Sequence, residues 1–434
     1  MTFADGLYGE LLERGVSYFV PESDWGAREP YASASPERLR LEEGPACVRF
    51  EWLGYRRELR GSFTESQLRM LRRIGSVLQA RYELLMDSER AVENFHLFRG
   101  LPEDRYVSAY LDPGPYHNLD SLTQVGDRVT EAIEVLRISS STTYENRRIE
   151  TGVLLFGPHQ DPCHLPPGLP QGALKYASDL TTSRSFHRLC DGLQTVALVD
   201  SEGRLVEIVD VADWARPYAE YTLPVPSAGR FEAHARSTLC GGHVCLVLTP
   251  NGEVKIFAEG GEAFRFLDGR WRLTDSVERY AVFEQAVGSA LAERLFRTAL
   301  NLAEDRRGGL FVVLHEQADA SKLIRPGDLL DAPVSQGPGR KGQFHYLLRG
   351  SRALDLPASV LESVARIDGA IVLDRDSQVL TFGAILIASA DDAQAVDGGR
   401  TTAALAASRY GNVLKVSEDG LVSFYREGRC VWEI

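Results

Sequence analysis

Three segments in the last third of the chain decide how the sequence is interpreted: Asp368-Gly369-Ala370-Ile371-Val372-Leu373, Gly399-Arg400-Thr401-Thr402-Ala403-Ala404 and Val416-Ser417-Glu418-Asp419-Gly420. The first segment places an acidic residue at the start of a strand. The second is a polar turn that opens an alanine-rich helix, and the third places another acidic residue where a strand enters a hairpin. Two carboxylates and a helix N-terminus together suit a metal ion bound to a phosphate group.

A helix and a buried strand lead into these segments. Asp275 can cap the helix together with Glu278, and apolar residues then recur on one face until the chain turns at Arg306-Arg307-Gly308. The apolar run that follows, to Val313, is typical of a buried strand. This order predicts one continuous helix followed by the first strand of an α/β domain.

Comparison of the chain with itself predicts a repeat, because strand and turn patterns of residues 150–271 recur in the same order in residues 308–432. The later half has Asp368-Gly369-Ala370 and Ser417-Glu418-Asp419-Gly420, whereas the earlier half has Asp191-Gly192-Leu193 and Thr249-Pro250-Asn251-Gly252. Proline neither ligates a metal nor donates a backbone hydrogen bond. We therefore expect two copies of one fold, the first without the site; a chance coincidence of short patterns is the alternative.

The order of the three segments resembles the diadenylate cyclase domain, the nucleotide-binding domain first described in the DNA integrity scanning protein family. In that family an Asp-Gly-Ala motif and the Ser-Glu of Val-Ser-Glu supply metal-binding carboxylates, and an Arg-His-Arg motif contacts the ATP phosphates. Asp368-Gly369-Ala370 and Val416-Ser417-Glu418 match the first two motifs, whereas Arg400-Thr401-Thr402 keeps only the first arginine. The resemblance covers roughly the last third of the chain.

The resemblance implies an α/β fold with a mixed central sheet flanked by helices. With the repeat, it predicts an N-terminal α+β accessory domain and two tandem copies, at residues 1–125, 126–275 and 276–434. It implies Mg2+ or Mn2+ bound by Asp368 and Glu418, with Asp368 and Arg400 as the catalytic residues of an active domain. The nucleotide would contact Gly369, Ala370, Gly399, Arg400, Thr401, Thr402 and Ser417.

The departure at Thr401 and Thr402 removes two phosphate contacts of the resembled family, and turnover needs such donors more than binding does. We therefore expect a sensor of an adenine nucleotide or a cyclic dinucleotide signal. One alternative is an active diadenylate cyclase that makes cyclic di-AMP from two ATP molecules, which calls for a homo-oligomer with domains face to face. The other alternative is a non-binding interaction protein with a vestigial pocket.

Composition narrows the class of protein. A chain of 434 residues with 44% hydrophobic content is long enough for two or three domains. Its net charge of -13 disfavours general binding to nucleic acid or to anionic lipid. No window approaches the ~20 apolar residues of a membrane span, and the chain opens without a leader pattern. With six scattered cysteines, these features predict a cytoplasmic protein without a membrane partner.

Two further regions carry weaker signals. In the N-terminal part, Thr64 and Gln67 can form a capping box for a helix with a regular apolar face, and nothing there suggests chemistry. The loop His159-Gln160-Asp161-Pro162-Cys163-His164 holds several potential metal ligands, but a structural zinc site usually has four at recognisable spacing. Because only isolated Cys190, Cys240 and His243 could complete it, a polar loop is expected there.

Overall fold

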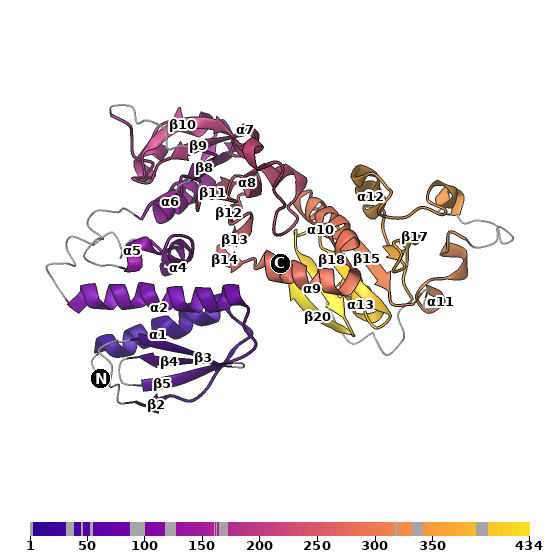
Figure 1. Cartoon of the computed structure of the whole chain (residues 1–434), viewed down its shortest axis with the longest axis horizontal. Helices are drawn as coiled ribbons and strands as arrows, with labels where there is room; N and C mark the ends of the chain where they lie inside the picture. The colour runs from indigo at the N-terminus through magenta and orange to yellow at the C-terminus, as the bar shows by residue number, and fades with distance from the viewer. Residues whose placement is uncertain are drawn as a thin grey trace. The chain divides into compact units, whose positions relative to one another are not determined.

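The computed structural model shows a mixed α/β protein with several sheets flanked by helices (Figure 1). It describes residues 3–31, 39–44, 47–52, 55–86, 100–117, 127–159, 161, 163–164, 172–316, 320–331, 342–387 and 398–434. Contacts divide the chain into two compact units, called unit 1 (Met1–Leu223 with Ala233–Asp275) and unit 2 (Pro224–Glu232 with Ser276–Ile434). The division into three domains stays a prediction.

The N-terminal part of unit 1 contains a five-stranded antiparallel sheet beside helices. The strands are β1 (Asp24–Trp25), β2 (Glu29–Pro30), β3 (Leu39–Gly44), β4 (Cys47–Trp52) and β5 (Tyr55–Arg60). The helices are α1 (Phe3–Phe19), α2 (Glu65–Met86), α4 (Pro102–Leu111) and α5 (Gly114–His117). The predicted capping box is confirmed, because the Thr64 N–H donates to Gln67 at 3.0 Å and the Gln67 N–H donates to the Thr64 hydroxyl at 3.1 Å.

The rest of unit 1 contains a seven-stranded sheet, called the first sheet, with the order β10-β9-β8-β11-β12-β13-β14. Its strands are β8 (Thr151–Leu155), β9 (Thr195–Val199), β10 (Leu205–Asp210), β11 (Val244–Leu248), β12 (Val254–Ala258), β13 (Gly261–Leu267) and β14 (Arg270–Leu273). Around it lie α6 (Arg128–Ser140), β6 (Thr143–Tyr144), β7 (Arg147–Arg148), η2 (Ser178–Thr182), η3 (Phe186–Arg188), α7 (Val211–Ala215), η4 (Arg216–Tyr218) and α8 (Glu232–Arg236). One apolar core joins this sheet to the N-terminal helices of the same unit.

Unit 2 contains a six-stranded sheet, called the second sheet, with the order β17-β16-β15-β18-β19-β20. Its strands are β15 (Gly309–Leu314), β16 (Ala370–Leu373), β17 (Val379–Ala384), β18 (Gly411–Val416), β19 (Val422–Arg426) and β20 (Arg429–Glu433). Its helices are η5 (Gly229–Phe231), α9 (Ser276–Val287), α10 (Ser289–Glu304), α11 (Ala320–Leu323), η7 (Pro326–Asp328), η8 (Gly342–Leu347), α12 (Ala358–Ala365) and α13 (Gly399–Ala407).

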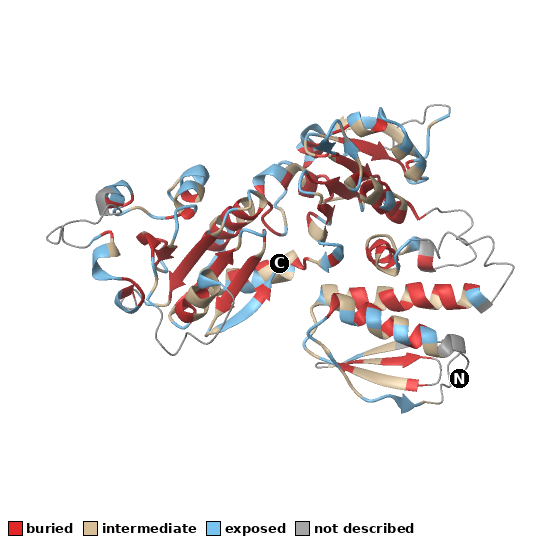
Figure 2. Cartoon of the chain, turned by 180° about the vertical axis from the view of Figure 1, so that it is seen from behind, coloured by how far each residue is buried: buried red, intermediate tan, exposed pale blue. Residues whose placement is uncertain are grey.

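Both faces of the second sheet are covered, so its central strands are buried along their whole length (Figure 2). Successive residues of β15 alternate between two cores, as strand geometry requires. Phe311 and Val313 pack in the core that holds α10 and α12, whereas Leu310 and Val312 pack in the core that holds α13. The alanines of α13 are small side chains between that helix and the sheet.

The six strands of the second sheet have the same order and direction as six strands of the first sheet, which has β14 in addition. In each, the first two strands pair in parallel and the neighbouring pairs are antiparallel. Their turns also match, because Asp200 accepts the backbone N–H groups of Glu202 and Arg204, and Asp374 accepts those of Asp376 and Gln378. That the sheets are copies of one domain stays a prediction.

Strand register corrects one detail of the predicted repeat. Ala197 lies opposite Val153 in the first sheet, and Ile371 lies opposite Phe311 in the second. Since Thr151 faces Leu248 and Gly309 faces Val416, Ala197 and Ile371 are equivalent. Gln194, and not Asp191, therefore stands where Asp368 stands, and Asp191 instead accepts turn N–H groups from Leu193, Gln194 and Thr195.

The predicted continuous helix is wrong, because it breaks at Gly288 into α9 and α10. Gly288 has a φ of 87°, which favours glycine, and it forms the N-cap of α10. The predicted cap at Asp275 is also wrong. This residue has a φ of 51°, and neither oxygen of its buried carboxylate has a hydrogen-bond partner among the described residues.

Candidate functional site

The three segments singled out in the sequence meet at the side chain of Arg400. Its guanidinium lies 3.0 Å from Glu418 Oε1 and 3.8 Å from Asp368 Oδ1. Arg400 comes from the first turn of α13, Glu418 from the turn after β18, and Asp368 from the turn before β16. The side chains of Asp368 and Glu418 are 94% and 70% exposed, so both carboxylates are open to a ligand from solvent.

A polar hollow of about 470 Å³ lies beside Arg400. Its lining residues come from the start of α13, the end of β18, the following turn and β20: Gly398, Gly399, Arg400, Thr401, Lys415, Ser417, Glu418, Asp419, Leu421 and Glu433. Five of the residues expected from the sequence therefore line one hollow, namely Gly399, Arg400, Thr401, Ser417 and Glu418. They bring both positive and negative groups to it.

Glycines make room at two points of this site. A Cβ on Gly308 would overlap the guanidinium of Arg400, so the absence of a side chain there lets the arginine reach the carboxylates. Gly369 has a φ of 114°, and a Cβ on it would overlap the backbone of Gly383 on β17. The glycine of the Asp-Gly-Ala motif is thus required by the approach of two strands.

The remaining expected residues lie beside the hollow or beneath it. Ala370 is buried in the core between the sheet and α13. The Thr402 hydroxyl donates to the Gly398 carbonyl at 3.3 Å, and the N–H groups of Thr401 and Thr402 bond to the same carbonyl. The N–H groups of Gly399 and Arg400, at the first two helical positions, have no acceptor within the helix.

Lys415 is a residue of this hollow that sequence analysis missed, as it also missed Leu421 and Glu433. It lies on β18, its ammonium is 3.2 Å from the Thr401 hydroxyl, and it sits over the Tyr425 ring. A lysine in an otherwise apolar strand is the only signal the sequence offers, and such a lysine usually points to solvent. Here the residue is only 8% exposed.

The carboxylates of Asp368 and Glu418 can bind a divalent cation, but two carboxylates alone do not form a complete metal site. Within the residues that the structure describes, no group of three or more His, Cys, Asp or Glu side chains is arranged to hold a metal ion. Mg2+ commonly takes only one or two protein carboxylates and completes its shell with phosphate oxygens and water. Asp368 and Glu418 could supply that pair once Arg400 turns to an anion.

A second polar cluster in unit 1 joins residues from the loop that was expected to be merely polar. Asp161 accepts hydrogen bonds from His243 at 2.9 Å and from the Tyr218 hydroxyl, and His164 lies 3.5 Å away. The Gly157 N–H donates to the other ring nitrogen of His243 at 2.7 Å, so His243 carries its proton on Nε2. Burial lowers the pKa of His243 despite the nearby carboxylate, so the cluster holds neutral imidazole and ties the loop to β11. Gln160 and Pro162 lie outside the described residues.

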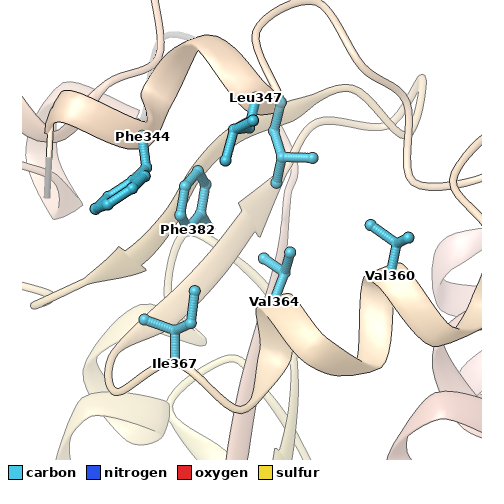
Figure 3. Close-up of a pocket in the computed structure, with 7 residues that line it drawn as sticks. Phe344, Leu347, Val360, Val364, Ile367 and Phe382 are labelled. Carbon is cyan, nitrogen blue, oxygen red and sulfur yellow. The ribbon is translucent and has the colours of Figure 1, made fainter.

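An apolar groove of about 640 Å³ lies elsewhere in unit 2 (Figure 3). Its walls are side chains of η8 and the residue after it, of α12, of β17 and of the turn between α12 and β16: Phe344, Leu347, Leu348, Val360, Val364, Ile367 and Phe382. Val364 and Phe382 pack in the core on the α10 and α12 face of the sheet, whereas Lys415 lies on the α13 face. The groove and the polar hollow are therefore separate.

Comparisons with known proteins show no family. No family model matches the chain, and no curated protein matches it. A hypothetical membrane spanning protein from Bacillus cereus is 22% identical, with a TM-score of 0.26, over 36% of this chain and 67% of its own. A double mutant of DacA from Staphylococcus aureus is 17% identical, with a TM-score of 0.23, over 32% of this chain and 82% of its own. Neither similarity is strong enough to indicate the fold or the function of this chain.

None of the helices in the described part of the chain has both the length and the apolar character to cross a bilayer.

Proposed function

We propose that unit 2 is a diadenylate-cyclase-like domain that binds an adenine nucleotide or a cyclic dinucleotide as its metal complex. In this proposal the first sheet belongs to a degenerate second copy, and the protein acts as a sensor of the bound nucleotide. The observation that carries the proposal is the meeting of three separate motifs at one guanidinium. Arg400 lies between Glu418 at 3.0 Å and Asp368 at 3.8 Å, although the motifs are far apart in the sequence.

The chemistry of the hollow supports a ligand that carries both a cation and an anion. The carboxylates of Asp368 and Glu418 suit a divalent ion, which would neutralise part of a phosphate charge. Arg400 can bind a phosphate with two parallel hydrogen bonds, and the first N–H groups of α13 favour an anion. In the free protein these carboxylates hold the arginine; when a metal complex binds, the arginine would turn to the phosphate.

The threonines at the start of α13 favour binding over turnover. The Thr402 hydroxyl is engaged with the Gly398 carbonyl, and the Thr401 hydroxyl contacts Lys415. Neither side chain carries the charge that the second and third residues of the family motif would supply. Losing one donor to transition-state charge typically costs about 100- to 1000-fold in rate. A protein with this hollow would therefore hold a nucleotide without rapid turnover.

Calorimetry of the full-length chain tests this proposal with ATP and with cyclic di-AMP, each with and without Mn2+. We expect metal-dependent binding that Asp368→Asn and Glu418→Gln each weaken, Glu418→Gln by roughly tenfold because a charge-assisted contact is lost. Matched controls are Asp376→Asn and Glu427→Gln, which remove carboxylates of the same unit outside the hollow. If all four variants bind the nucleotide with equal affinity, the hollow is not the nucleotide-binding site.

Analysis of the reaction products distinguishes a sensor from an enzyme. After incubation of the protein with ATP and Mn2+, a sensor leaves ATP unchanged apart from binding. If cyclic di-AMP forms at enzyme-like rates and Asp368→Asn abolishes its formation, the protein is an active cyclase and not a sensor. If the protein binds no nucleotide, the remaining alternative is an interaction protein.

A further inference from the structure

Lys415 is a buried cation without a described counter-charge. Its side chain lies on the α13 face of β18 and is 8% exposed. Its contacts are neutral, a hydroxyl at 3.2 Å and an aromatic ring whose centroid is 5.6 Å away. Among the residues that the structure describes, no carboxylate lies within ion-pair distance of its ammonium. Burying a charge without a partner is costly, so such a group calls for an anion from elsewhere.

The neighbouring carboxylates are engaged with other groups. Across the sheet, Lys415 lies opposite Ser423, and Ser423 lies opposite Glu433 on β20. Glu433 accepts a hydrogen bond from the Ser423 hydroxyl at 2.9 Å, and Glu418 is held by Arg400. The lysine therefore faces the hollow with its charge unmatched.

The first sheet contains a buried lysine whose charge is matched inside the protein. Lys255 on β12 is 1% exposed, and its ammonium lies 3.3 Å from Glu262, which also binds Arg265 at 2.7 Å. Lys255 occupies the position equivalent to Ser423, one strand away from Val247, the equivalent of Lys415. Lys255 is thus neutralised within the protein, and Lys415 differs from it in this respect.

We infer that Lys415 is an anchoring residue for a phosphoryl group bound in the hollow, where it supplies the second positive charge that Thr401 and Thr402 lack. The anion would lie between Lys415, Arg400 and the first N–H groups of α13. Lysine acts as a point charge toward phosphate, and the Thr401 hydroxyl holds its ammonium toward α13. That the phosphoryl group belongs to a nucleotide rests on the proposed function. The inference itself concerns the anion.

The test measures binding of inorganic pyrophosphate, ATP and adenosine to the full-length protein. We expect Lys415→Gln to weaken pyrophosphate and ATP roughly 10- to 100-fold, as for loss of a charged hydrogen bond, and to leave adenosine unchanged. Lys415→Arg should restore part of the loss. The matched control is Lys322→Gln, because Lys322 also sits over a tyrosine ring of unit 2, at 5.5 Å, but is exposed.

The outcomes separate this inference from the proposed function. If ATP binds the natural protein and Lys415→Gln binds it equally well, the inference fails and the nucleotide proposal stands. If pyrophosphate binds through Lys415 while ATP and cyclic di-AMP do not bind, the inference stands and the nucleotide proposal fails. If no phosphate compound binds, both are overturned.

Thermal unfolding provides a readout that a structural lysine would not give. Lys415→Met removes a buried charge, so the ligand-free variant should unfold at the same or a higher temperature while pyrophosphate no longer stabilises it. A large fall in the unfolding temperature without ligand would show that Lys415 has an internal ionic partner, which would overturn the inference.

Discussion

The first six strands of the first sheet follow the same order as the six strands of the second, but the two sheets differ in how they accommodate buried charge. In the first, Lys255 and Arg265 share the carboxylate of Glu262, and Val247 lies beside them. In the second, the equivalent of Lys255 is Ser423, and the lysine lies one strand away at Lys415. The first arrangement is an internally neutralised cluster, whereas the second leaves a polar hollow lined by groups of both signs.

This difference shows that the strand framework does not by itself determine whether a site exists. Both sheets keep the turn bonds of Asp200 and Asp374 and the same positions for the hairpin after the fourth strand. The chemistry depends on a few side chains at equivalent positions, such as Lys415 and Glu418 against Val247 and Pro250. Function belongs to such sites and not to the fold. The following experiments exchange or remove those side chains.

The largest expected effect comes from placing the lysine of the second sheet in the first. Val247 is buried and lies directly opposite Lys255, so Val247→Lys would bury a second ammonium beside the first. We expect the free energy of unfolding of unit 1 to fall by about 3 to 5 kcal/mol. Urea unfolding with hydrogen exchange of the β11 amides measures it, with Val247→Met as the control for size. A tolerated lysine would show that the first sheet also has room for a charge.

The next effect concerns the ionic cluster of the first sheet. Burial alone would raise the pKa of Glu262, but the charges of Arg265 and Lys255 outweigh it and lower the pKa from 4.5 to about 2. A lowered folded-state pKa stabilises the protein above the unfolded pKa, and this contribution is lost as pH falls from about 4.5 toward 2. Glu262→Gln should therefore cost about 3 kcal/mol at neutral pH and flatten the stability profile in that acid range.

Glu433 of the second sheet provides the control for Glu262→Gln. Glu433→Gln removes a carboxylate that accepts only a serine hydroxyl among its described hydrogen bonds, so its cost should be below about 1 kcal/mol. Denaturant unfolding as a function of pH compares the two variants. Equal costs would mean that the two sheets do not differ in how buried charge is compensated.

A smaller effect tests whether the hairpin after β18 can be converted to that of the first sheet. In both, the N–H of the fourth turn residue, Gly420 or Gly252, bonds to the carbonyl of the first. Glu418 and Pro250 occupy the second position, which favours proline. Glu418→Pro should thus leave the unfolding temperature nearly unchanged while weakening metal-dependent ATP binding about tenfold. Calorimetry and thermal unfolding separate these effects; unchanged binding would exclude Glu418 from the site.

The smallest effect should be the same in both sheets. Asp200 and Asp374 each accept two turn N–H groups at 2.8 to 3.0 Å, so Asp200→Ala and Asp374→Ala should each cost about 1 kcal/mol. Asp200 also pairs with Arg204 at 3.0 Å, and because the Arg204 side chain is 29% exposed, this pair should add only a small part of the cost. Chemical denaturation of each variant checks this, and a clear difference between them would argue against equivalent turns.

Local patterns in the sequence were sufficient for the parts of the fold that depend on neighbouring residues. The apolar run at Val244–Leu248 predicts β11 with its bounds, and Thr64 with Gln67 predicts the start of α2. Such features are predictable because strand periodicity and helix caps involve residues a few positions apart. The continuous helix failed because Gly288 adopts a left-handed conformation, which an apolar pattern does not reveal.

The sequence by itself therefore determined several strands and helices, among them β11 and α2, and the three motifs, whereas the tertiary structure decided which side chains meet. Strand register places Gln194 and not Asp191 at the position of Asp368, and the packing of α13 on the sheet places Lys415 beside Thr401. The folded chain also brings Asp161 to His243, two residues that no spacing rule connects. A shift of one residue in register reverses every side chain of a strand, so contacts between distant segments follow only from the folded arrangement.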